Sequence, residues 1–365
     1  MGKPLYGLDK ELLAAVQAND TEQAILCLNA GANPYACNEQ NSDVITSAAA
    51  HGNVGILRAL KNNGVDLADD SKTGGWTPLH AACMNNRYEA VDFLLQFYSR
   101  EDLKRGMVGK TPLHFAVAKG SARLIKRLAE AGAPLDAEEY NGATPLSRAI
   151  EYANPEAVQG LLEAGADPGN QLHAALVEAA LFDMISANNE KDAEGAGVIS
   201  LLNKAGLSMN ITAGRDITNV RFGDSLLYHA LKCRRYAAAR AILQGEGADV
   251  HGVSHAGKSA MHHCLDLRLK EGVEMLLDRG FDADRVFDYT RGPDDNGDPR
   301  RHSSSAKDHA MELVRNLTHP AYREMLQMIE AAEEARAEAA QQERARLNQV
   351  TARIKARTPR FRISP

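Results

Sequence analysis

Histidine is the residue type in this chain best suited to acid–base chemistry at neutral pH. His80 and His114 stand in the same local setting, each directly after a Thr-Pro-Leu sequence, and each is a candidate general base. A second group lies close together in the chain and comprises His251, His255, His262, His263 and Cys264. Histidine and cysteine are zinc ligands, but this spacing matches no common zinc pattern. We therefore predict no metal site and no cofactor.

Glycine-containing turns stand directly before expected helix starts, where a phosphate-binding loop would also stand. They contain Gly74 and Gly75, Gly109, and Gly142. None is followed by the Gly-Lys-Ser/Thr sequence of a nucleotide-binding loop, and their regular recurrence is typical of turn glycines. No serine, cysteine or acidic pair is spaced for nucleophilic or acid–base catalysis. The sequence thus predicts no enzyme active site.

The elements that carry these residues repeat along the chain. The word TPLHAA at 77–82 returns as TPLHFA at 111–116 and as TPLSRA at 144–149, with a period of about 33 residues. Threonine caps the open amides of a helix start, and proline is tolerated at the first helical position. A second sequence feature has the same period: glycines that are expected to end a helix recur at that spacing. These pairs are Gly31 and Gly64, Gly132 and Gly165, and Gly247 and Gly280.

The word and its period resemble the ankyrin repeat. The resemblance is firm over residues 8–287 and looser to about residue 335. It implies an all-α ankyrin-repeat solenoid of about nine helix pairs with short β-hairpin loops, followed by a C-terminal helical extension. In this family the histidine of the word hydrogen-bonds backbone between repeats. The resemblance therefore gives His80 and His114 a structural role.

Two repeats depart from the pattern. In the third, Phe97-Tyr98-Ser99 stands in place of the closing glycine, which predicts a longer second helix or a remodelled connection. The sixth repeat (170–222) carries two insertions. The first, Ser186–Gly195, has the composition of a polar loop before a helix at Val198–Ala205. The second covers about 207–222, and long insertions in a compact array are usually functional or disordered.

The chain beyond the array divides into three parts. The expected organisation is an ankyrin repeat array at 8–287, a loop at 288–305, a degenerate capping helix pair at 306–335, and a helical extension with a basic tail at 336–365. Residues 288–305 are rich in Asp, Pro, Gly and Ser, which favours a loop. Terminal repeats cover the last apolar face, so an atypical sequence is expected at 306–335.

The resemblance also implies where a partner binds, because ankyrin proteins usually use their hairpin tips and the first-helix face on the concave side. Counted from each threonine, the hairpin sites are four, three and one residues before it, and the helix sites seven and eight residues after it. The candidate partner-binding residues are Trp76, Met84, Asn85, Met107, Lys110, Lys119, Tyr140, Glu151, Tyr152, Arg221, Phe222 and Lys232. Several are of the aromatic, Met and Arg types that interfaces concentrate.

Trp76 is the main candidate anchor, as the only tryptophan in the chain. We expect the fold not to need Trp76 and Tyr140 in its core. Two alternatives to partner binding remain open for the whole set. The residues could be scattered over the surface without a common role, or they could pack against the sixth-repeat insertion.

Composition and charge exclude few function classes. Apolar content of 44%, charged content of 25% and a net charge of -6 are ordinary for a folded soluble protein. The sequence contains no run of about 18 apolar residues, so it predicts no membrane span. The first ten residues are polar and lack the apolar core of a signal peptide. Five unpatterned cysteines favour a reducing compartment. We therefore expect a cytoplasmic protein.

The predicted function is a non-enzymatic adaptor that binds another protein on the concave face. Residues 344–365 contain seven basic residues and no acidic one, and we expect them to form a solvated, disordered end. The same segment leaves two alternatives for the function. This segment suits an anionic partner, either nucleic acid or membrane lipid. It also resembles the basic C-terminal export signals of some bacterial secreted effectors, many of which carry ankyrin repeats. The second alternative is thus an effector that is secreted into a host cell and captures a host protein.

Overall fold

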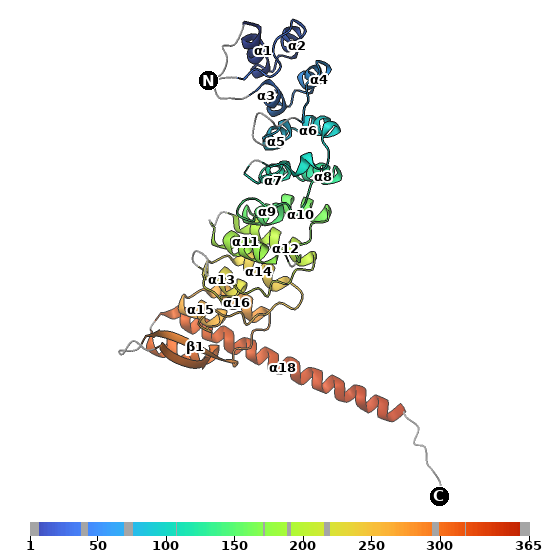
Figure 1. Cartoon of the computed structure of the whole chain (residues 1–365). Coiled ribbons are helices and arrows are strands. Elements are labelled where there is room, and N and C mark those ends of the chain that lie inside the picture. The colour runs from blue at the N-terminus through green and yellow to red at the C-terminus, as the bar shows by residue number, and fades with distance from the viewer. Residues whose placement is uncertain are drawn as a thin grey trace.

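The computed structural model describes residues 7–37, 43–68, 76–106, 108–170, 172–187, 191–214, 220–293, 299–317 and 319–357. Within these ranges the α-helices form nine consecutive pairs, which stack into an elongated array (Figure 1). The first helices of the pairs form an inner row and the second helices an outer row. The predicted all-α solenoid is therefore confirmed.

The inner row consists of α1 (Gly7–Gln17), α3 (Val44–His51), α5 (Pro78–Met84), α7 (Pro112–Ala118), α9 (Pro145–Glu151), α11 (Ala174–Ser186), α13 (Leu226–Lys232), α15 (Ala260–Asp266) and α17 (Ala306–Asn316). The outer row consists of α2 (Thr21–Asn29), α4 (Val54–Asn62), α6 (Tyr88–Leu94), α8 (Ala122–Glu130), α10 (Pro155–Glu163), α12 (Asp192–Lys204), α14 (Tyr236–Gln244), α16 (Lys270–Asp278) and α18 (Pro320–Arg357). Each inner helix packs on its outer partner and on the inner helix of the next pair.

The closing glycines adopt the backbone conformation that the sequence predicts. Gly31, Gly132 and Gly165 have φ angles of 90°, 92° and 99°, the left-handed region that ends a helix at low cost when no Cβ is present. This conformation turns the chain out of each outer helix toward the next repeat.

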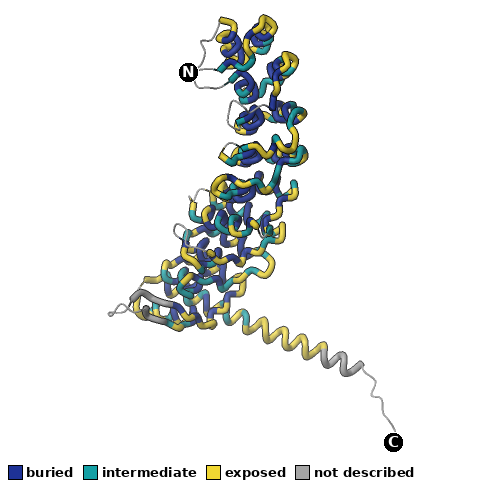
Figure 2. The backbone as a smooth tube through the Cα atoms, in the orientation of Figure 1, coloured by how far each residue is buried: buried dark blue, intermediate teal, exposed yellow. Residues whose placement is uncertain are grey.

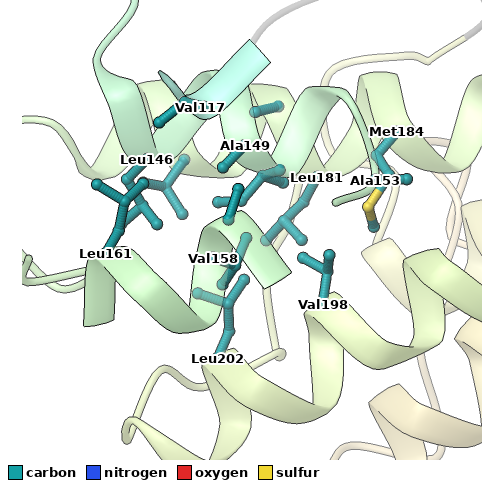
Figure 3. Close-up of a cluster of buried hydrophobic side chains, with 14 of the residues drawn as sticks. Val117, Leu146, Ala149, Ala153, Val158, Leu161, Leu181, Met184, Val198 and Leu202 are labelled. Carbon is teal, nitrogen blue, oxygen red and sulfur yellow. The ribbon is translucent and has the colours of Figure 1, made fainter. Parts of the chain in front are cut away.

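The apolar core is continuous from one repeat to the next. Buried residues run along the axis of the whole array (Figure 2), and one cluster of buried apolar side chains includes residues from every helix pair. Figure 3 shows part of this cluster around the fifth and sixth pairs, where Ala149 and Val158 of one pair and Leu181 and Val198 of the next gather in the same buried region. Because each pair buries its face only against its neighbours, the stability of the array is a sum of local terms.

The third repeat ends in a remodelled connection. Of the two outcomes expected from its sequence, a longer second helix or a remodelled connection, this is the second. After α6 the chain forms two 3₁₀ turns, η1 (Leu95–Phe97) and η2 (Asp102–Lys104). Tyr98 replaces the missing glycine as an anchor, because its hydroxyl donates to the Leu67 carbonyl over 3.0 Å and accepts from the Leu79 amide over 3.4 Å.

The sixth repeat differs from the predicted polar loop. Ser186 belongs to α11 and α12 begins at Asp192, so the first insertion lengthens both helices to 13 residues. Asp192 is favourable there because acidic residues suit a helix N-terminus. Its carboxylate also accepts from the amides of Ala237 and Ala238 over 2.9 and 3.2 Å, which caps α14 of the next repeat.

The second insertion packs against the array over its described part. Met209, Ile211, Ala213 and Val220 are buried, and the Leu226 amide donates to the Ile211 carbonyl over 2.8 Å. The insertion is therefore a structural part of the hairpin between the sixth and seventh pairs.

The predicted loop at 288–305 is wrong, because most of it is an antiparallel hairpin. Strands β1 (Val286–Pro293) and β2 (Pro299–Ser305) pair with Val286 opposite Ser305, and the register shifts between Arg291 and Pro293. Phe287 and Tyr289 point into the core with exposed fractions of 7% and 3%. Burial of these two rings holds a segment whose composition otherwise favours a loop.

Helix α18 closes the array and then leaves it. Tyr322, Met325 and Ile329 are buried, whereas every residue from 337 to 350 is exposed. The helix projects well beyond the last repeat (Figure 1). The predicted capping pair and extension thus share one uninterrupted helix, and the tail from residue 358 lies outside the described residues.

Candidate partner-binding surface

The repeated histidines link neighbouring repeats. His80 Nδ1 accepts from the Thr77 amide over 3.1 Å, so its Nε2 carries the proton and donates to the Lys110 carbonyl over 3.2 Å. His114 does the same with Thr111 and with the Ala143 carbonyl, over 3.2 and 3.4 Å. Burial lowers the pKa of both rings, for His80 to about 4. Both rings are therefore neutral at pH 7 and serve as linkers.

The His-rich stretch forms part of the same framework. His262 contacts the Ser259 hydroxyl over 2.7 Å and the Ser304 hydroxyl of β2 over 3.3 Å. His309 of α17 lies beside it, with ring centroids 5.1 Å apart, and contacts Asp266 Oδ1 over 2.7 Å. Across the described ranges, no three His, Cys, Asp or Glu side chains converge as metal ligands would.

The hairpin turns between pairs, which we call fingers, stack on one another. Gly109 has a φ of 77°, and a Cβ there would lie 2.8 Å from the Tyr140 amide nitrogen of the next finger. Gly257 makes the same kind of close approach near the C-terminal end of the array, where a Cβ would clash with the Asp288 carbonyl oxygen of β1. Fingers can stack this closely because the contacting residues are glycines. The β1–β2 hairpin is therefore the last finger of the row.

Large apolar side chains stand exposed at the finger tips. Val108, Tyr140, Leu172 and Phe222 have exposed fractions of 55%, 83%, 79% and 66%; we call these four residues the finger strip. The backbone of Tyr140 lies against Gly109, next to Val108. Leu172 precedes His173, whose Nε2 contacts Glu138 of the Tyr140 finger over 3.0 Å. The first three residues of the strip thus belong to adjoining segments.

Val108 adopts an unfavourable conformation at this position. Its φ is 58°, which is rare for a β-branched residue because Cβ crowds the backbone. Glycine or asparagine would fit the turn better. A strained, exposed, apolar residue points to a role in binding rather than in folding.

A second row of exposed side chains lies where the inner helices end. Met84 is the last residue of α5, Lys119 and Tyr152 are the C-caps of α7 and α9, and Leu267 is the C-cap of α15. Met84, Tyr152 and Leu267 have exposed fractions of 39%, 38% and 44%.

The candidate residues from the sequence fall into three groups. Exposed residues are Met84, Asn85, Lys119, Tyr140, Glu151, Tyr152, Arg221, Phe222 and Lys232. Trp76 and Lys110 are half-buried, and Met107 lies outside the described residues. Whether these residues bind a partner stays a prediction.

Trp76 is held by the array, so the expectation that the fold does not need it is wrong. Its ring stacks on His80 at 5.5 Å and meets the Phe115 ring edge-on at 5.2 Å. The sequence pattern places Trp76 one residue before the repeat word, but it does not show that Phe115 of the next repeat lies within reach.

Two other candidates belong to an ion-pair network. Arg148 contacts Glu139 over 2.8 Å and Glu151 over 2.7 Å, and Lys110 lies 3.9 Å from the same Glu139. The Glu139 side chain is only 6% exposed. Arg148 neutralises it, and Glu139 in turn raises the pKa of Arg148. Lys110 and Glu151 therefore contribute to the structure as well as to the surface.

Sequence reasoning missed Leu172. The sixth repeat lacks a threonine that would fix the count of positions, so the repeat pattern predicts no candidate residue there. The separation of Leu172 from Tyr140 is close to one repeat period, and this is the signal that would have found it.

The basic end is described only in part. Arg344 and Arg346 are exposed on α18, and side chains beyond residue 350 are not described. An anionic partner and an export signal therefore stay predictions. No described helix is both long and apolar enough to cross a bilayer.

Taken together, the stacked pairs, the fingers and the neutral histidine links define a helical repeat solenoid. Comparison with known proteins gives its family. The model for ankyrin repeats (3 copies) matches residues 12–105 and 99–171. We conclude that the chain is an ankyrin repeat protein.

Several curated proteins are similar over part of their length. The mouse B-cell lymphoma 3 protein homolog is 27% identical over 212 residues, covering 57% of this chain and 45% of that protein. A putative ankyrin repeat protein of fowlpox virus is 31% identical over 135 residues, covering 36% of this chain and 18% of that protein. Human ankyrin repeat and SOCS box protein 3 is 36% identical over 103 residues, covering 27% of this chain and 19% of that protein. The chain thus spans less than half the length of each of these relatives.

Ankyrin repeats generally mediate protein–protein interactions and are usually non-catalytic. The family therefore implies a protein partner without identifying it, because function resides in sites on the fold rather than in the fold.

Proposed function

We propose that this protein is a non-enzymatic adaptor, and that its partner protein docks along the finger strip and the adjoining ends of the inner helices. The observation that carries the proposal is the finger strip itself. Its four side chains are large, apolar and more than half exposed, at turn positions where polar or small residues would satisfy the fold. Exposed aromatic and aliphatic groups in a row are typical of an interface.

The strip and the helix ends differ in polarity, which supports a core-and-rim arrangement. Tyr140 and Val108 lie at the tips, whereas Lys119 and Glu151 are charged and exposed near the helix ends. Interfaces commonly place apolar anchors at the centre and charged groups at the rim. We therefore assign most of the binding free energy to the tips and most of the orientation to the helix ends.

The test is affinity capture from cell extract with quantitative mass spectrometry, using the full chain and three variants. Tyr140→Ala removes the most exposed aromatic tip, and we expect about 30-fold weaker capture of the specific partner, as for an interface hot spot. Val108→Asn relieves the unfavourable backbone conformation, so it should bind less while folding at least as well. Loss of binding without loss of stability separates a docking role from a structural one.

Leu26→Ala is the matched control. Leu26 lies on the outer helix α2 and is 56% exposed, close to the 55% of Val108. A partner that is lost in Tyr140→Ala and Val108→Asn but kept in Leu26→Ala supports the proposal. A partner captured equally by all four proteins binds elsewhere, and the finger strip would then have no docking role.

A further inference from the structure

The projecting part of α18 has an unusual division of charge. Residues 333–343 contain four glutamates and one arginine, whereas residues 344–357 contain five basic residues and no acidic one. Acidic-then-basic order suits the helix dipole, but that effect is confined to the first and last turns. Segregation over this whole length therefore needs another explanation.

The face of α18 that packs on the array continues past it. Ile329 is fully buried, and Leu347 follows it after about five complete helical turns, which places both residues on the same side of the helix. Leu347 and Val350 are nevertheless 56% and 45% exposed, one turn apart. An apolar stripe thus extends beyond the surface that covers its first part.

The projecting segment, residues 337–357, is about 30 Å long at a rise of about 1.5 Å per residue. In proteins most helical stability comes from packing of an apolar face rather than from propensity. Within 337–350 the described side chains are exposed, and the closest ion pair is a weak one, Arg346 to Glu343 at 4.0 Å. A packing partner would therefore stabilise this segment.

We propose that the projecting segments of two copies of this chain pack against each other in antiparallel orientation, so that α18 is a dimerisation helix. Antiparallel packing brings the acidic half of each helix beside the basic half of the other. It also sets Leu347 and Val350 opposite the alanine-rich half that contains Ala337, Ala339 and Ala340, and large residues opposite small ones pack densely. Parallel packing would instead place like charges together, which is unfavourable.

This assignment goes beyond the adaptor function and is independent of it, because the finger strip lies elsewhere on the chain. It requires a two-fold contact, in which both copies use the same surface. A second copy supplies the complementary charge without any additional protein.

Sedimentation equilibrium of the full chain tests the proposal. We expect a species of twice the 39.5 kDa chain mass. Leu347→Glu should give a monomer at concentrations where wild type is dimeric, with unchanged circular dichroism from the repeats. Leu26→Glu, at the same exposed fraction of 56%, should stay dimeric. A wild-type chain that is monomeric at every soluble concentration overturns the proposal, as does a dimer that survives Leu347→Glu.

A charge-exchange pair tests the orientation. Glu338→Arg with Glu343→Arg makes the segment wholly basic between 337 and 350, and Arg344→Glu with Arg346→Glu makes it wholly acidic. Each variant alone should be monomeric, and an equimolar mixture should recover the dimer. If each variant dimerises alone, charge pairing does not direct the contact and the antiparallel arrangement is wrong.

Discussion

Acidification should destabilise the array through the histidine links, and His80 allows the effect to be calculated. Its Nδ1 accepts a hydrogen bond from the Thr77 amide, so a proton on Nδ1 would face another N–H and break that contact. Burial lowers the pKa of His80 to about 4, from an ordinary value of 6.5. The unfolded chain therefore binds the proton more readily, and stability is lost as the pH falls below 6.5 toward 4.

The size of the loss follows from these two values. Between pH 7 and pH 5 the unfolded state gains about 2 kcal/mol relative to the folded state through this one ring, since each pKa unit corresponds to about 1.4 kcal/mol. The ring is fully buried, so solvent does not screen the effect. Other buried histidines add to the total loss of stability, and a comparison with a variant that lacks only His80 cancels their contribution.

The assay uses His80→Ser, a change that the chain already contains in another repeat. In the fifth repeat Ser147 takes the place of histidine and still accepts from the Thr144 amide over 2.9 Å. Urea unfolding of both proteins is followed by the fluorescence of Trp76, which is the only tryptophan and stacks on His80. Its signal therefore reports on the same repeat.

His80→Ser should be less stable than wild type at pH 7, because the Lys110 carbonyl loses its donor. Between pH 7 and pH 5, however, the variant should lose about 2 kcal/mol less than wild type. Titration of the remaining histidines cancels in this difference. An acid loss of the same size in both proteins would refute the reasoning, since the ring would then carry no depressed pKa.

Two further predictions concern the finger row and are checked by urea unfolding. Gly31→Ala introduces only an unfavourable φ, because nothing lies within 4 Å of a Cβ there, and should cost about 1 kcal/mol. Gly109→Ala adds a contact of 2.8 Å with the Tyr140 amide and should cost at least about 2 kcal/mol; equal costs would mean that the fingers do not stack as described. Arg148→Met leaves buried Glu139 charged, with the more distant Lys110 ammonium at 3.9 Å, and should cost about 3 kcal/mol. Adding Glu139→Gln should recover most of that loss in the free energy of unfolding. If stability is not recovered, the Arg148→Met variant is destabilised by lost packing and not by the unpaired charge of Glu139.

The repeat words predicted the regular part of the fold because each word specifies a local structure. Thr111, Pro112 and His114 together fix a helix start and a link to the next repeat, and the closing glycines fix the ends. Where a word is intact, its threonine also sets the count of surface positions, so exposed Tyr140 and Tyr152 could be placed from the sequence.

The sequence was less informative where long-range contacts decide the outcome. Phe287 and Tyr289 alternate with the exposed residues Val286 and Asp288, which is the pattern of a half-buried strand, but the surrounding Asp, Pro and Gly favoured a loop. The Phe287 ring contacts His251, His262 and Phe281, and the Tyr289 ring also contacts His262, so their partners include residues from earlier repeats. The role of Trp76 in packing cannot be predicted from the sequence for the same reason, because its partner Phe115 comes from the next repeat.

Stability and recognition are assigned to different residues of each finger. The neutral histidines and the Glu139–Arg148 pair hold neighbouring repeats together, whereas Val108 and Tyr140 project from the same turns into solvent. If the finger strip is the docking surface, substitution at a tip should change binding with little effect on folding, and substitution at a link should do the reverse.

If both proposals hold, the dimer carries two finger strips on one particle. A partner that is itself immobilised in many copies would then be bound at two sites, and avidity would exceed the affinity of one strip by about 100-fold or more. Leu347→Glu should abolish this gain on a dense surface while leaving the affinity for a soluble, monovalent partner unchanged. The dimerisation helix would thus set how strongly the adaptor distinguishes clustered partners from dispersed ones, although the finger strip lies in the turns between the third and seventh pairs.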